Sequence, residues 1–126
     1  MDIKIQVDYW EKSAKHDQGK IPMAARKPEI MKILRKLLVT LNENKVPVSE
    51  AYLFGSYANE SSSQYSDIDI ALISEALTGI RYLDIKKIGR LVRNIDSRIE
   101  IHPFSLKDKG ESMFLDEIIR TGIRVA

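Results

Sequence analysis

Two short segments on either side of a polar loop decide the fold of this chain. Residues 53–58 read Leu-Phe-Gly-Ser-Tyr-Ala, and residues 66–70 read Ser-Asp-Ile-Asp-Ile. Apolar residues over 48–54 predict a strand that ends at the glycine, and strict alternation over 67–73 predicts a second strand. One face of the second strand is apolar, and the opposite face begins with two carboxylates, Asp67 and Asp69.

Hydrophobic periodicity outside these segments predicts three helices and two more strands. A helix begins at Pro28 and ends by Asn44, and others cover 80–95 and 113–120. Residues 98–104 alternate as a strand, Gly122 caps the last helix, and residues 123–125 are an expected edge strand. The side chains expected to face inward on the last two helices are Leu83, Ile88, Leu91, Val92, Ile95, Met113, Phe114, Ile118 and Ile119.

This order of elements predicts an α/β (α+β) domain. We expect a small mixed β-sheet with helices packed mainly on one of its faces. The domain covers residues 28–126. Residues 1–27 form an N-terminal extension, a short helix or strand followed by a linker, and its mobility is left open.

Composition narrows the class of protein further. The chain has 126 residues, of which 44% are hydrophobic and 30% are charged, as expected of one globular domain. It has no cysteine, which excludes disulfides and thiolate metal sites and fits a reducing, cytoplasmic location. No segment suggests a membrane span or a signal peptide. A net charge of +2 is too mild to favour nucleic-acid binding.

The paired carboxylates indicate a metal site. Asp67 and Asp69 are two apart on a strand, so their side chains project from the same face and repel each other unless a cation lies between them. Mg²⁺ prefers such oxygen ligands, and two ions can assist an in-line phosphoryl displacement. Glu100 joins this cluster if the strand over 98–104 neighbours the strand that carries the aspartates.

Gly55 and Ser56 provide the second half of the predicted site. Glycine lets the backbone approach a ligand and adopt a positive φ. If a helix begins at this turn, its N–H groups favour a phosphate, and the Ser56 hydroxyl adds a donor. One end of the site would then bind phosphates and the other end metal.

Together, the segments over 53–58 and 66–70 resemble the signature of the DNA polymerase beta nucleotidyltransferase superfamily. The size of the chain is similar to that of its minimal nucleotidyltransferase (MNT) branch, and the resemblance covers roughly residues 28–126. It implies that Gly55 and Ser56 bind the β- and γ-phosphates of ATP, and that Asp67 and Asp69 hold Mg²⁺. Glu100 would be the third carboxylate, which helps to bind one metal and activates the attacking hydroxyl. Minimal members usually have aspartate there, so this assignment departs from the family pattern.

The resemblance also implies a partner. Proteins of this branch are commonly encoded beside a helical HEPN-domain toxin and act as its antitoxin, which can adenylylate the toxin. We therefore expect transfer of AMP from ATP to a hydroxyl on a partner protein, since the chain is too short to enclose a second substrate.

Several alternatives stay open from the sequence. The domain could neutralise its partner by contact without turnover, or modify an aminoglycoside-like small molecule, although no second acidic cluster suggests the pocket this needs. A homo-oligomer could complete the site. His102 is interpreted as a structural or surface residue. The cations at 86, 87, 90 and 93 are interpreted as a solvated helix face, with a phosphate or partner contact as the alternative.

Overall fold

The computed structural model describes residues 28–57 and 66–126. The expected N-terminal extension and most of the polar loop after Tyr57 lie outside these ranges. The helices are α3 (Pro28–Glu43), α4 (Arg81–Ile95) and α5 (Met113–Thr121), with short 3-10 turns η1 (Gly55–Tyr57) and η2 (Leu106–Asp108). The strands are β1 (Glu50–Phe54), β2 (Ile68–Ile73), β3 (Ile99–Phe104) and β4 (Ile123–Arg124). Each helix and strand that the sequence predicts in these ranges is present.

The described strands form one mixed sheet in the order β3-β2-β1-β4. β1 pairs antiparallel with both β2 and β4, while β2 and β3 are parallel. A parallel pair needs a crossover connection, and α4 provides it between β2 and β3. This crossover places the strand that carries Glu100 directly beside the strand that carries Asp69.

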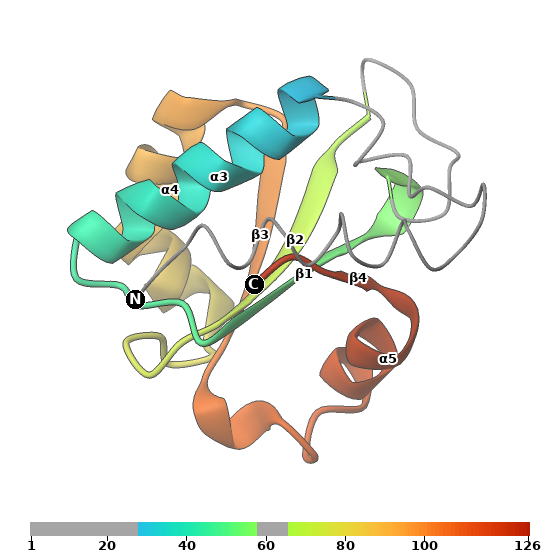
Figure 1. Cartoon of the computed structure of the whole chain (residues 1–126). Coiled ribbons are helices and arrows are strands. Elements are labelled where there is room, and N and C mark those ends of the chain that lie inside the picture. The colour runs from blue at the N-terminus through green and yellow to red at the C-terminus, as the bar shows by residue number, and fades with distance from the viewer. Residues whose placement is uncertain (1–27, 58–65) are drawn as a thin grey trace.

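The two faces of the sheet are covered unequally. Figure 1 shows α3 and α4 together on one side and α5 on the other. The α3–α4 side contains the larger core, to which β2 contributes Ile68, Ile70 and Leu72. On the α5 side, Leu115 and Ile118 pack against a smaller cluster that includes Ala71 and Phe104. The predicted α+β class, with helices mainly on one face, is confirmed.

Two helices present different residues inward from those expected. On α5, Met113 is 88% exposed and Phe114 is 53% exposed, whereas Leu115 and Ile118 are buried. The buried stripe passes through 115, and Met113 lies two residues earlier, which is about 200° around a helix. The inward placement of Met113 was therefore wrong, whereas Phe114 is half exposed and turns one side toward the rings on the sheet.

On α4, the expected inward residue Leu83 is exposed and its neighbour Asp84 is buried instead. The Asp84 carboxylate accepts hydrogen bonds from the backbone N–H groups of Thr78 and Gly79 at 2.9 Å each, and another from the Thr78 hydroxyl. A buried polar group needs such partners. Asp84 thus ties the start of α4 to the loop before it, which sets the position of Arg81.

Strand β3 lies at the edge of the sheet. The backbone carbonyls of Arg98 and Phe104 accept hydrogen bonds from the N–H groups of Ile68 and Ser74, so the backbone N–H and C=O groups of the even-numbered residues of β3 are directed toward β2. The backbone groups of the odd-numbered residues are directed away from β2, and Pro103 is one of these residues. Proline has no N–H to donate, so it is tolerated at this outer side.

Within the described ranges, no helix is long and apolar enough to cross a membrane.

Candidate active site

Asp69 and Glu100 lie side by side on neighbouring strands. They are register partners in the β2–β3 pair, and adjacent strands in a sheet are about 4.8 Å apart. Partners in register project from the same face, which here is the face opposite α3 and α4. The adjacency on which the predicted role of Glu100 depends is therefore present.

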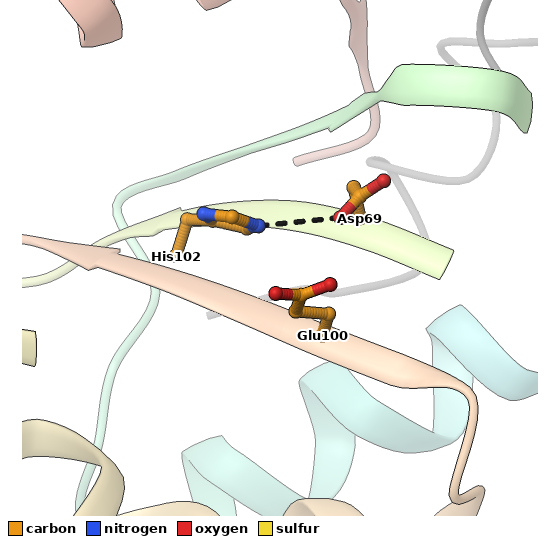
Figure 2. A group of neighbouring side chains, drawn as sticks. All are labelled: Asp69, Glu100 and His102. Carbon is orange, nitrogen blue, oxygen red and sulfur yellow. Dashed lines mark hydrogen bonds and ion pairs between the residues drawn. The ribbon is translucent and has the colours of Figure 1, made fainter. Parts of the chain in front are cut away.

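His102 is the third member of this cluster. It lies two residues after Glu100 on β3, and its Nε2 is 3.3 Å from Oδ1 of Asp69. Figure 2 shows Asp69 on β2 facing both β3 side chains. One ligand atom from each of the three residues lies within 4.8 Å of the others. The interpretation of His102 as a surface or purely structural residue missed this contact, although its spacing from Glu100 already placed both on one face.

Aromatic rings hold the imidazole of His102 in place. Its ring lies 4.8 Å from that of Phe54 and 5.9 Å from that of Phe114, both in edge-on arrangements. Such contacts stabilise a ring orientation. Phe114 therefore packs over the cluster at the edge of the α5 side, which explains why it is only half exposed.

Gly55 lies directly against Asp69. It has a φ of 74°, and a β-carbon built on it would overlap Oδ2 of Asp69. Glycine is needed at this turn both for the left-handed backbone and for the lack of a side chain. The sequence predicted that the backbone here approaches a bound phosphate, whereas the contact that the structure shows is with the carboxylate of Asp69. Ser56 follows in η1 and is half-buried.

Asp67 lies just before β2 and is exposed. Its oxygens are not in the group formed by Asp69, Glu100 and His102. Its negative charge still acts on Asp69. The structure thus brings Asp69 and Glu100 together tightly, with Asp67 at the margin of the cluster.

Burial raises the pKa of the Asp69 carboxyl above its ordinary value, and the negative charges of Glu100 and Asp67 act in the same direction. The hydrogen bond and charge of His102 oppose this shift in the pKa without cancelling it. Burial and like charges both disfavour the ionised carboxylate. A cation at this position would relieve the cost of ionisation.

The donor set suits a hard divalent cation. Asp69 and Glu100 offer carboxylate oxygens, which Mg²⁺ prefers, and their side chains are 22% and 41% exposed, so water or phosphate oxygens can complete a coordination shell. The alignment of Asp69 with Glu100 comes from the sheet itself, which keeps the two carboxylates together without a bound ion.

A comparison with protein families agrees with this geometry. Residues 35–126 match the family described as polymerase beta, nucleotidyltransferase. The match covers most of the chain, so the protein belongs to the polymerase beta nucleotidyltransferase family. Among curated proteins, no match to the chain is found. The domain is of the nucleotidyltransferase type, and its function is in general terms nucleotidyl transfer.

Proposed function

We propose that the chain transfers AMP from ATP to a hydroxyl group on a partner protein, a HEPN-type toxin, and acts as its antitoxin. The observation that supports this most directly is the pairing of Asp69 with Glu100 on adjacent strands. In a nucleotidyltransferase, two neighbouring carboxylates of this kind supply the oxygen ligands for Mg²⁺.

Asp67, Asp69 and Glu100 would hold the metal, and two Mg²⁺ ions, when bound, would neutralise charge on the reacting phosphate. Glu100 accepts the proton of the acceptor hydroxyl. The hydroxyl oxygen forms a bond to the α-phosphorus of ATP, and the bond between that phosphorus and the oxygen that bridges the α- and β-phosphates breaks. Pyrophosphate leaves toward Gly55 and Ser56. Catalysis then consists of positioning and charge stabilisation.

The exposure of Glu100 favours a protein acceptor. Its side chain is 41% exposed and belongs to the edge strand β3, so a hydroxyl on a large partner can reach it. An aminoglycoside-like acceptor would need an acidic pocket of its own. Within residues 28–57 and 66–126, the cluster of Asp69, Glu100 and His102 is the one group of three or more such side chains close enough to hold a metal ion.

The test is to co-express the chain with a HEPN-domain protein encoded beside it and to measure the intact mass of that partner. We expect an increase of one or more AMP units with the wild type and none with Asp69→Ala or Glu100→Ala. Glu111→Ala is the matched control, since this carboxylate is exposed and lies between η2 and α5, outside the cluster. An unmodified partner that binds wild type and variants equally would overturn the enzymatic proposal and favour neutralisation by contact.

A further inference from the structure

Arg81 reaches the cluster from a different element. It is the first residue of α4, and its guanidinium Nη2 lies 3.2 Å from Oε1 of Glu100. Its Nη1 lies 3.4 Å from Nδ1 of His102. A single guanidinium thus contacts two of the three clustered residues, and neither contact was expected from the sequence.

The contact between Arg81 and His102 favours one tautomer of the imidazole. Arginine has five N–H donors and no acceptor, so Nδ1 of His102 must accept the hydrogen bond. The proton of a neutral imidazole is then on Nε2, from which it is donated to Oδ1 of Asp69 at 3.3 Å. Arg81 therefore acts on Asp69 indirectly, because it favours the form of His102 that donates to Asp69, and it contacts Glu100 directly.

The backbone of Arg81 is fixed independently of these contacts. Asp84, which is 1% exposed, binds the backbone of the loop at residues 78 and 79, and the N–H of Asp84 donates to the carbonyl of Ile80. The side chain of Arg81 is 51% exposed and can leave Glu100 without disturbing the core. These are the properties of a counter-ion that can be exchanged.

We infer that Arg81 is the resident counter-ion of the third carboxylate, and that a divalent cation must displace its guanidinium to bind Glu100. The inference rests on the metal site of the proposed function and adds a positioning residue to it. In the absence of metal, Arg81 offsets the repulsion between Glu100 and Asp69 and keeps His102 in the Nε2–H form. Upon metal binding it releases Glu100 and becomes free to pair with an anionic substrate.

The test measures binding of Mn²⁺ to the full chain by electron paramagnetic resonance, without nucleotide, for the wild type and four variants. Arg81→Met removes the competing charge and is expected to lower the Kd roughly three- to tenfold, the effect of one exposed charge a few ångströms from a divalent ion. Arg81→Lys retains the charge, and its Kd should stay near that of the wild type. Arg90→Met removes a cation farther along the same helix and should leave the Kd unchanged.

A second readout follows the histidine. The ¹⁵N chemical shifts of His102 should indicate the Nε2–H form in the wild type and a smaller fraction of that form in Arg81→Met, in which the hydrogen bond to Asp69 alone favours it. An unchanged or higher Kd in Arg81→Met would overturn the inference, whatever the tautomer of His102 in that variant. If Asp69→Asn fails to weaken Mn²⁺ binding, the metal site of the proposed function fails. If Asp69→Asn weakens binding but Arg81→Met does not tighten it, only the role of Arg81 fails.

Discussion

The carboxylate of Asp69 occupies the space that a β-carbon on Gly55 would require. The turn after β1 and the start of β2 are thereby coupled: the position of the site carboxylate depends on the absence of a side chain across from it.

Gly55→Ala should displace Asp69 and weaken metal binding at least tenfold, while also destabilising the fold. The backbone at φ 74° penalises alanine by about 1–2 kcal/mol, and the overlap with Asp69 adds to that. Gly110→Ala is the matched control, because Gly110 has a φ of 81° and nothing within 4 Å of an added β-carbon. Urea denaturation and Mn²⁺ titration of both variants separate the two effects. Equal losses of stability with normal metal binding in both would contradict the coupling.

Asp69→Asn should make the metal-free protein more stable at neutral pH. Burial raises the pKa of Asp69 in the folded state, so between its unfolded and folded values the folded protein binds more protons. Stability therefore falls as the pH rises through this interval, and asparagine removes the dependence. The gain should disappear as the pH is lowered toward the ordinary carboxyl value of 3.8. Urea denaturation across this pH range provides the measurement. An Asp69→Asn variant less stable than the wild type at pH 7 would contradict the predicted gain in stability.

Glu50→Gln should show the opposite dependence on pH. Burial alone raises the pKa of Glu50, but hydrogen bonds from Lys109 and Tyr52, together with the positive charges of Lys109 and Arg124, outweigh it, and the net shift in its pKa is downward. Its stabilising contribution is therefore present above the unfolded pKa and is lost as the pH falls through the folded pKa. We expect a loss of about 1–3 kcal/mol at pH 7, typical of a charged hydrogen bond.

The control for Glu50 is Glu117→Gln, which breaks a 2.6 Å pair with Arg120 whose side chains are 58% and 70% exposed. Exposed pairs contribute about 0–1 kcal/mol, so this variant should be nearly neutral at every pH. Comparable losses in both variants would show that the partial burial of Glu50 has no influence on its energetics.

His102→Phe should preserve the fold and impair the site. The new ring can keep the packing with Phe54 and Phe114, but it cannot donate to Asp69. Groups that orient a metal ligand typically contribute 10- to 100-fold in metal affinity or activity. We expect a loss of that order in AMP incorporation into the co-expressed partner, with a melting temperature close to that of the wild type. Full activity in this variant would assign His102 to packing alone.

The sequence was sufficient for most of the fold because its periodicities are local. The alternation over 67–73 and the three- and four-residue steps of the helices depend on near neighbours, and each produced the expected element. The errors occurred where tertiary contacts overrule hydrophobicity. Asp84 is buried in place of Leu83 because the adjacent loop needs an acceptor for its N–H groups. In the short helix α5, Met113 lies on the side that faces away from the sheet.

The site was predictable in part for the same reason. Asp69 and Gly55 lie within one short stretch, so their spacing indicated both residues, but not the direct contact between them. Glu100 depended on which strands are neighbours, a condition that the sequence could state but not decide. Arg81 lies 19 residues before Glu100 on another element, and only the crossover of α4 past the edge of the sheet brings its guanidinium to the carboxylate. No local pattern contains that information.

Pro103 affects the tendency of this domain to aggregate at high protein concentration. An exposed edge strand is a template on which other chains can add strands, and natural sheets commonly interrupt such edges with proline. Here the interruption lies next to His102 and three residues from Glu100. The exposed edge at β3 can thus stay accessible to a docking partner, while Pro103 hinders aggregation by the addition of further strands to the same edge.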